Sequence, residues 1–259
     1  MIKIEDLHVI FNKSKALEKH ALKGINLDIE QGSFVTVIGA NGSGKSTLLG
    51  TLAGDILPTK GRLLFNNKDV SKEKTTDRAL KVARVFQDPL KGSCGALTIE
   101  ENMALAYKRG RPRGLSIALS KHNRKFFQEK ISILKMNLEN RLQNKMSSLS
   151  GGQRQAIALI MATLAPSDIL LLDEHTAALD PATAHFIMHL TNKLVKDNKL
   201  TTLMVTHSMQ QALDFGDRLI MIYEGEIILD ANAQEKQKLT PTDLVALFNE
   251  KAKFDSVEL

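Results

Sequence analysis

The stretch Gly39–Ala40–Asn41–Gly42–Ser43–Gly44–Lys45–Ser46–Thr47 decides the fold class, because it fits the phosphate-loop pattern G-x-x-x-x-G-K-[ST]. The apolar run of residues 34–38 precedes it and predicts a strand. Residues 46–56 have a helical pattern that we expect Pro58 and the following turn to end. A strand, a glycine-rich loop and a helix in this order predict a nucleoside triphosphate site.

The chemistry of this loop follows from its residue types. Successive backbone N–H groups at a helix N-terminus wrap anionic phosphates, Lys45 bridges the β- and γ-phosphates, and the Ser46 hydroxyl binds Mg²⁺. An ordinary glycine-rich turn does not require the glycines, the lysine and the hydroxyl in this register after a strand. The predicted nucleotide-binding residues here are Gly39, Asn41, Gly42, Ser43, Gly44, Lys45, Ser46 and Thr47.

A second stretch, Leu149–Ser150–Gly151–Gly152–Gln153, narrows the function, since a phosphate loop alone occurs in many classes of protein. The two stretches together resemble the ATP-binding-cassette (ABC) family, in which each LSGGQ completes the ATP site of a second cassette. The resemblance covers essentially the whole chain, with the motifs in the family's order. It implies an ATPase that binds ATP and Mg²⁺.

The fold class implied is α/β: a P-loop NTPase (ABC ATPase) core with an antiparallel β portion and an inserted all-helical subdomain. Early alternating residues such as Ile2 and Ile4 predict the antiparallel strands. We expect one cassette over residues 1–259, because no internal repeat is visible. Its parts are a core (residues 1–90 and 166–230), a helical subdomain (91–165) and a short C-terminal helical tail (231–259).

Local signals predict where several helices begin. A capping box of Thr98 and Glu101 opens a helix to Tyr107, and Ser150 caps another to residue 165. Further expected helices cover residues 123–135, the segment after the cap Asp180 with Pro181 in its first position, and a short segment from Thr240–Pro241.

The strand Ile169–Leu172 ends in two carboxylates and resembles the Walker B strand of the family. Asp173 is expected to hold Mg²⁺ through water, and Glu174 to polarise the attacking water as the catalytic base. A solvated turn with a helix cap would explain the pair in isolation, but not beside a phosphate loop. His175 stands where the family frequently has proline. We assign it no catalytic role; the alternatives are a residue that tunes pH dependence and a tolerated loop residue.

Further roles come only from the resemblance. Gln87 matches the Q-loop, a hinge that contacts Mg²⁺ or the attacking water, and His207 matches the switch histidine that hydrogen-bonds the γ-phosphate. Asp180 matches the D-loop at the dimer interface and is also a helix cap. Phe11 stands where the family places its adenine-stacking aromatic, the alternative being a packing residue, whereas Phe34 is expected in the core.

The LSGGQ stretch has a function only in a dimer. Ser150, the backbone of Gly151 and Gly152, and Gln153 form a second anion-binding helix start. Since the phosphate loop serves the chain's own ATP, this helix start is expected to face the γ-phosphate bound by a partner. The predicted partner is a second copy of the chain, with two ATP molecules between the copies.

Composition limits the other classes. At 259 residues with 43% hydrophobic residues, the chain can build a real core, and its longest nearly apolar run, residues 156–165, is too short to span a bilayer. No apolar signal region opens the chain, so we expect it to stay in the cytoplasm. The family resemblance implies that it acts at the cytoplasmic face of a bacterial cell membrane. Cys94 is the single cysteine of the sequence, so an internal disulfide is excluded. We interpret Cys94 as a buried or partly buried packing residue rather than a reactive thiol. The charge of +6 is spread out, apart from a basic stretch at residues 108–113 that is expected to be a solvated loop, and no nucleic acid is expected as a partner.

The transport path must belong to another chain, so the expected partners are an integral membrane permease and, indirectly, an extracytoplasmic solute-binding protein. The segments Glu101–Tyr107 and Asp173–Pro181 resemble bacterial importer ATPases of the tryptophan/tyrosine uptake type. This resemblance implies import of a small solute, an amino acid and in particular an aromatic one. Two alternatives stay open: a soluble ABC ATPase of the iron–sulfur cluster assembly type, and the ATPase of an exporter. A P-loop kinase would leave LSGGQ unexplained.

Overall fold

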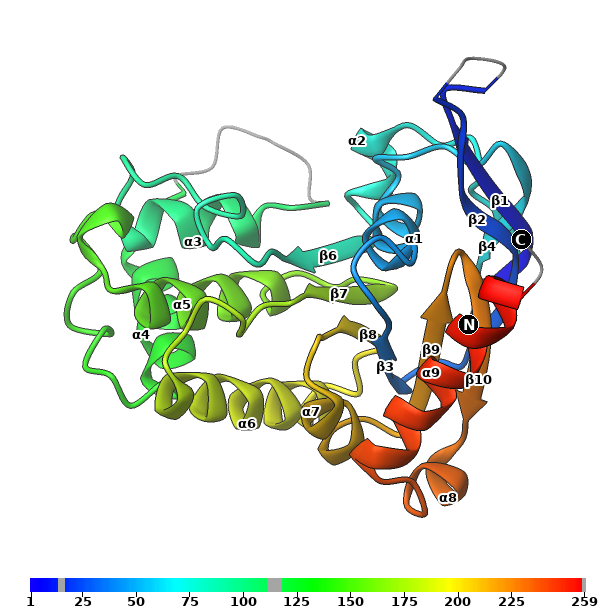
Figure 1. Ribbon diagram of the computed structural model, residues 1–259. Coiled ribbons are helices and arrows are strands. Elements are labelled where there is room, and N and C mark those ends of the chain that lie inside the picture. The colour runs from blue at the N-terminus through cyan, green and yellow to red at the C-terminus, as the bar shows by residue number, and fades with distance from the viewer. Residues whose placement is uncertain (14–16, 111–117, 258–259) are drawn as a thin grey trace. The chain divides into compact units, whose positions relative to one another are not determined.

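The protein is described by a computed structural model that covers residues 1–13, 17–110 and 118–257. The chain divides into two compact units (Figure 1). Unit one comprises Met1–Arg78 and Lys199–Leu259, and unit two comprises Ala79–Asn198.

Unit one contains the antiparallel sheet that the early alternation predicts. Strand β1 (Ile2–Phe11) pairs antiparallel with β2 (Lys19–Ile29) and with β4 (Lys60–Phe65), and β5 (Lys68–Asp69) continues the sheet. Alternate residues of β1 are buried, which explains why a period of two was visible in the sequence. Strand β4 was not predicted, because Gly61 and the charged residues around it weaken its pattern.

A parallel arrangement in unit one positions the phosphate loop. The fully buried strand β3 (Phe34–Ile38) lies parallel to and between β8 (Thr202–Val205) and β9 (Arg218–Tyr223), and β10 (Glu226–Ala231) pairs antiparallel with β9. A strand buried on both faces reads as a continuous apolar run, as predicted for residues 34–38. The phosphate loop follows the carboxyl end of β3.

Helix α1 (Lys45–Ala53) follows the loop and is shorter than the helix expected over residues 46–56. It ends because Gly54 adopts a left-handed conformation (φ 82°), in which its N–H bonds to the carbonyls of the last turn. The glycine therefore ends the helix before Pro58 is reached.

The other helices of unit one are short, except the last. They are α2 (Thr75–Arg78), α7 (Met209–Asp214), α8 (Ala233–Lys236) and α9 (Pro241–Val257). With 17 residues, α9 is longer than the short helix predicted. It lies beside α7 (Figure 1) and buries Leu244 in a core cluster with Ile38, Ala212 and Met221.

Unit two contains two parallel strands, β6 (Val82–Val85) and β7 (Ile169–Asp173), with Val85 opposite Leu172. Between residues 91 and 165, the elements in the described part are all helical: α3 (Ile99–Tyr107), α4 (Lys121–Ser132), η1 (Met146–Ser148) and α5 (Gly151–Thr163). Helix α6 (Pro181–Asp197) completes the unit. The subdomain boundaries given above stay predictions.

The helix starts predicted at Thr98, Ser150 and Asp180 are confirmed. Thr98 and Glu101 form a reciprocal capping box, and Ser150 forms one with Gln153. Asp180 accepts a hydrogen bond from the backbone of Thr183 at the start of α6. Helix α4 begins two residues before the predicted start because Ser120 caps it.

Two surface features bear on the predictions from composition. Cys94 is exposed, so its interpretation as a packing residue is wrong: Asn102 hydrogen-bonds the backbone N–H and carbonyl of Cys94 and leaves the thiol at the surface.

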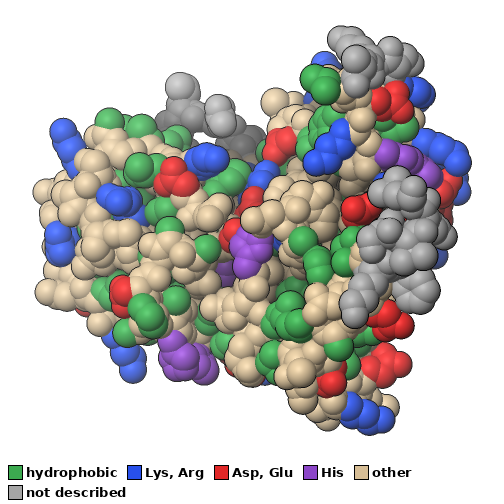
Figure 2. All heavy atoms as spheres, viewed as in Figure 1, with side chains coloured by type: hydrophobic (Ala, Val, Ile, Leu, Met, Phe, Trp, Pro, Cys, Tyr) green, Lys and Arg blue, Asp and Glu red, His purple; other side chains and the backbone are tan. Residues whose placement is uncertain are grey.

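On the face seen in Figure 2, Lys and Arg are interspersed with Asp and Glu. Of the basic stretch 108–113, residues 111–113 lie outside the described residues. None of the helices in the described ranges has the length and apolar character needed to cross a membrane.

Candidate functional site

A cavity of about 240 Å³ in unit one contains most of the predicted nucleotide site. Strands β1 and β2 supply one side and the phosphate loop the other, so the structure brings Phe11 together with the loop. The lining residues are Phe11, Lys19, Ala21, Gly42, Gly44, Lys45, Ser46 and Thr47. Phe11 is 39% exposed, whereas Phe34 is in the core at 2%, as predicted.

The backbone of the loop is shaped for an anion. Gly42 and Gly44 have left-handed φ values of 79° and 110°, and a Cβ on Gly44 would lie 2.6 Å from the Ala21 carbonyl oxygen. Such glycines let successive N–H groups converge on one point. The Ser43 hydroxyl is buried and has no hydrogen-bond partner among the described residues. A buried polar atom of this kind needs a partner, which a phosphate oxygen would provide.

The Lys45 ammonium is held over the loop. Its side chain is 4% exposed, and Nζ donates to the carbonyl oxygens of Gly39 and Ala40 at 2.8 and 2.7 Å. Asn41 and Ser46, in contrast, are exposed. Lys45 is therefore positioned by the loop itself.

His207 lies at the same sheet edge as the phosphate loop. It follows β8, and the N–H of Thr206 donates to the carbonyl of Val37 at 3.1 Å, near the end of β3. The carboxyl ends of parallel strands share one edge of a sheet. The structure thus brings His207 to the edge from which the loop emerges.

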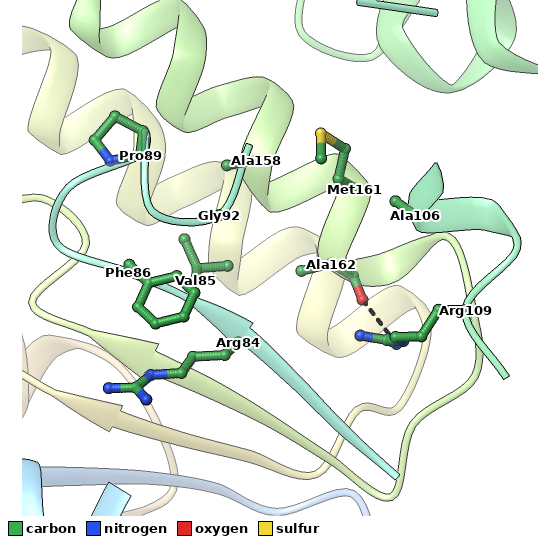
Figure 3. A pocket seen from close by; sticks show the side chains of 10 residues that line it. All are labelled: Arg84, Val85, Phe86, Pro89, Gly92, Ala106, Arg109, Ala158, Met161 and Ala162. Carbon is green, nitrogen blue, oxygen red and sulfur yellow. Dashed lines mark hydrogen bonds between the residues drawn. The ribbon is translucent and has the colours of Figure 1, made fainter. Parts of the chain in front are cut away.

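Unit two brings three other predicted residues to one edge. Asp173 ends β7 and is followed by Glu174, and Gln87 follows the neighbouring strand β6 and is exposed. In addition, Nη2 of Arg84 lies 2.7 Å from Oδ2 of Asp173, with both side chains 17% exposed. The Arg84 guanidinium lies 4.5 Å from the centre of the Phe86 ring (Figure 3).

Sequence reasoning missed Arg84. The available signal was a charged residue in the middle of the buried strand Val82–Val85, where an unpaired charge would be costly. Its partner could not be identified, because Asp173 is distant in the sequence.

His175 is not an exposed loop residue. It is 1% exposed, and its Nε2 lies 3.0 Å from Oγ1 of Thr191 in α6. Burial lowers the pKa of His175 to about 4, so the imidazole is neutral near pH 7. Glu174, which precedes it, has a left-handed backbone with φ 45°.

The LSGGQ stretch forms the start of α5. Ser150 Oγ accepts from the Gln153 N–H at 3.3 Å, and Gln153 Oε1 accepts from the Ser150 N–H at 3.2 Å. The first-turn N–H groups of Gly151 and Gly152 have no intrahelical acceptor and can bind an anion. A Cβ on Gly152 would lie 2.4 Å from Cγ2 of Thr183, so glycine allows α5 to approach the first turn of α6.

Asp180, at that turn, is an exposed cap. Its side-chain hydrogen bond with Thr183 lowers the pKa of the Asp180 carboxyl. The capping role is confirmed, and a role at a dimer interface stays a prediction.

The residues assigned to Mg²⁺ fit that ion chemically. Ser46, Gln87 and Asp173 offer a hydroxyl, an amide and a carboxylate oxygen, the hard donors that Mg²⁺ prefers. Within the part of the chain that the structure describes, no group of three or more His, Cys, Asp or Glu side chains could hold a metal ion. Mg²⁺ usually keeps several waters and binds substrate phosphates with one or two protein side chains.

Comparison with known proteins identifies the family. Residues 22–177 match the family model described as ABC transporter. The tyrosine transport ATP-binding protein of Clostridioides difficile is 40% identical, over 96% of this chain and 98% of that protein. The energy-coupling factor transporter ATP-binding protein EcfA2 of Clostridium perfringens is 34% identical, over 93% and 83%.

Solved structures agree with the fold. A dimeric ATP-binding cassette in a post-hydrolysis state with ADP and Pi superimposes with a TM-score of 0.77 at 31% identity, covering 90% of this chain and 99% of that one. ABC cassettes of this kind bind ATP and ADP, and some are dimeric. The chain thus has the ABC ATPase fold, a P-loop NTPase with an antiparallel β subdomain, and belongs to the ABC transporter family as a subunit whose ATP hydrolysis is coupled to transport.

Proposed function

We propose that two copies of this chain close around two ATP–Mg²⁺ and drive the import of a small solute, an amino acid and in particular an aromatic one. The chain would act at the cytoplasmic face of the membrane with an integral permease, which an extracytoplasmic binding protein supplies with solute. The observation that supports the proposal is that Ser150 of LSGGQ is exposed and caps a helix start, which would be a second anion site besides the phosphate loop.

In this proposal, unit one holds the nucleotide. Phe11 stacks on adenine, the loop N–H groups surround the phosphates, and Lys45 neutralises the β- and γ-phosphates. The buried Ser43 hydroxyl would donate to a phosphate oxygen. Ser46, Gln87 and Asp173 would hold Mg²⁺, which neutralises charge that develops on the phosphates.

Glu174, Gln87 and His207 would carry out the hydrolysis. Glu174 takes a proton from the attacking water, and Gln87 orients that water. His207 donates a hydrogen bond to the γ-phosphate and stabilises its charge in the transition state. The water oxygen bonds to the γ-phosphorus as the bond from the γ-phosphorus to the β–γ bridging oxygen breaks, which gives ADP and inorganic phosphate. When the phosphate leaves, the contacts that it made between the two copies are lost.

The partner's γ-phosphate would be bound by Ser150, Gly151 and Gly152, with Gln153 fixing the cap and Asp180 crossing the interface. Relatives of this fold have been solved as dimers, which supports a second copy as the partner. Two composite sites then make closure dependent on ATP.

A surface in unit two suits contact with a permease. The segment after Gln87 and helix α3 carry exposed apolar side chains, with Leu90 47% and Leu105 62% exposed. Beside them, a small cavity of about 110 Å³ lies between β6, α5 and the loop that contains Pro89 and Gly92 (Figure 3). We propose that a permease segment covers these leucines, which would remove their apolar surface from water.

Import of an aromatic amino acid is supported by the relative named for tyrosine transport, which aligns over nearly its whole length. The test is the ATPase rate in proteoliposomes that contain the permease, with and without the solute-loaded binding protein. We expect stimulation by the loaded binding protein, because it favours the closed state. Gln87→Ala should reduce this stimulation more than it reduces ATP binding. Gln210→Ala, at an exposed position of α7, is the control.

Equal rates with and without the loaded binding protein would contradict import. Stimulation by outgoing solute alone would indicate an exporter, and co-purification with a soluble scaffold would indicate the iron–sulfur assembly type. The ABC ATPase assignment would stand in each case.

A further inference from the structure

We propose that His175 is a positioning residue: its hydrogen bond to Thr191 ties the loop that carries the Glu174 carboxylate to helix α6. The inference rests on the proposed function of Glu174 as the base. Glu174 and His175 are adjacent in sequence, and Thr191 lies in the interior of α6.

The positions of the protons determine which atom is the donor and which the acceptor in the hydrogen bond between His175 and Thr191. The Thr191 hydroxyl has one proton and donates it to the carbonyl of Ile187 at 2.8 Å. At 3.0 Å, His175 Nε2 must therefore be the donor, and Thr191 Oγ1 accepts. The proton is on Nε2, so this tautomer is set by the helix.

Both partners are buried, His175 at 1% and Thr191 at 0% exposure, so water cannot replace the bond. An imidazole that left this position would lose its partner and leave the Thr191 oxygen with less hydrogen bonding. The side chain is thus fixed in one place, and the backbone on either side of it is fixed with it.

The backbone of Glu174 needs such an anchor. Its φ of 45° is a left-handed conformation that costs free energy in a residue with a Cβ and persists only where surrounding contacts hold it. One contact is the turn in which the Ala177 N–H donates to the Glu174 carbonyl at 3.0 Å. A second is the His175 side chain, which holds the next residue of the chain. Both contacts constrain the direction in which the Glu174 carboxylate leaves the backbone.

Helix α6 connects this anchor to the proposed dimer contacts. Asp180 caps the helix, and Thr183 in its first turn lies against Gly152 of LSGGQ. Thr191 follows Asp180 by roughly 16 Å along the helix axis, at about 1.5 Å per residue. Helix α6 therefore contacts the LSGGQ segment near its start and the Glu174 loop farther along, so one rigid element positions both.

The test compares matched substitutions at the two ends of the bond. His175→Leu and Thr191→Val remove it, whereas His175→Gln keeps an N–H donor the same number of bonds from Cα and Thr191→Ser keeps the hydroxyl. We expect kcat to fall by at least about tenfold in the first two, since a displacement of about 1 Å in a reacting group can cost about a hundredfold. The KM for ATP should stay within about twofold, because the phosphate loop is unchanged. His175→Gln and Thr191→Ser should retain most of the wild-type activity.

A double-mutant cycle separates positioning from loss of stability. If the residues act through one bond, His175→Leu/Thr191→Val should be no slower than His175→Leu alone. Thr36→Val is the control for stability: Thr36 is also fully buried, and its hydroxyl donates to backbone carbonyls. It should lower Tm and leave kcat unchanged. Should His175→Leu fail to fold, the near-isosteric Thr191→Val carries the test.

Wild-type kcat in Thr191→Val, additive losses in the double variant, or an equal loss of kcat in Thr36→Val would overturn the proposal. Glu174→Gln is assayed in parallel. If Glu174→Gln is inactive and Thr191→Val is normal, only the positioning role fails. If Glu174→Gln turns over normally, the assignment of the base itself fails.

Discussion

Arg84 inside β6 and Asp173 at the end of β7 form an ion pair between two adjacent parallel strands, with Nη2 of Arg84 2.7 Å from Oδ2 of Asp173. The carboxylate that we assign to Mg²⁺ is therefore already paired with a cation through one oxygen. In the proposed site, the other oxygen, Oδ1, would bind the ion or its water. Carboxylates that bind metals are commonly oriented by such hydrogen bonds.

Replacing Arg84 with Met should destabilise the nucleotide-free protein. The substitution leaves the Asp173 carboxylate, 17% exposed, without its cation, and we expect the free energy of unfolding to fall by about 2 kcal/mol. Arg84→Lys should lose less. In Arg84→Met/Asp173→Asn most of the loss should be recovered, because no unpaired charge remains. Denaturant unfolding measures all three, and an unchanged Arg84→Met would show that the pair contributes nothing.

Phe11→Ala should weaken ATP binding by about fivefold to a hundredfold, as expected for loss of a stacking contact of about 1–3 kcal/mol. Phe11→Tyr should bind normally. Leu57→Ala, which alters an apolar residue that is 58% exposed and does not line the cavity, is the control. Calorimetric titration with ATP measures each affinity. A normal affinity of Phe11→Ala for ATP would contradict stacking on adenine and would show that Phe11 is a packing residue.

Composite sites predict that two inactive variants restore activity when they are mixed. Lys45→Ala should weaken ATP binding, and Ser150→Arg should spare binding but block closure. In a mixed dimer one site has both defects, while the other combines an intact phosphate loop with an intact LSGGQ. ATPase activity should therefore rise on mixing. A mixture that forms mixed dimers and stays inactive would count against sites shared between copies.

Lys236 should make stability depend on pH at the alkaline end. Its Nζ is buried and donates to the carbonyl of Gly216 at 2.9 Å, and burial lowers the pKa of Lys236 from 10.5 to about 8. Between these values the unfolded chain keeps a proton that the folded chain has lost, so the free energy of unfolding rises with pH. Stability is thus gained towards pH 10.5 and lost as pH falls towards 8.

Lys236→Met should lack this rise, a difference from wild type of at most about 3 kcal/mol across the window. Lys238→Met, at an exposed neighbouring position, should keep the wild-type pH dependence. Chemical unfolding at several pH values gives the comparison. A slope in Lys236→Met equal to that of wild type would show that burial does not lower the pKa of Lys236.

Local sequence signals predicted local structure well. The capping box at Thr98 and the cap at Ser150 could be predicted because donor and acceptor are three residues apart. The predicted end of α1 was wrong because the left-handed cap at Gly54 ends the helix before Pro58 is reached. A single glycine in a helical pattern does not by itself indicate such a cap.

Contacts between distant residues were out of reach. The exposure of Cys94, the pairing of Arg84 with Asp173 and the bond from His175 to Thr191 all depend on which elements pack together. The phosphate loop was recognisable because its chemistry lies within one short segment. The residues that position Glu174 come from another helix, so no spacing in the sequence indicates them.

The most direct test of the ATP-bound dimer is to measure the mass in solution of the Glu174→Gln variant in the presence of ATP and Mg²⁺. The amide preserves the shape of the side chain and removes the base, which should lower kcat by about a hundredfold or more. ATP then stays bound, and size-exclusion chromatography with light scattering should show a dimer of this variant that wild type, as it hydrolyses ATP, does not accumulate. A Glu174→Gln protein that stays monomeric with ATP bound, or that hydrolyses ATP at the wild-type rate, would contradict closure around ATP with Glu174 as the base.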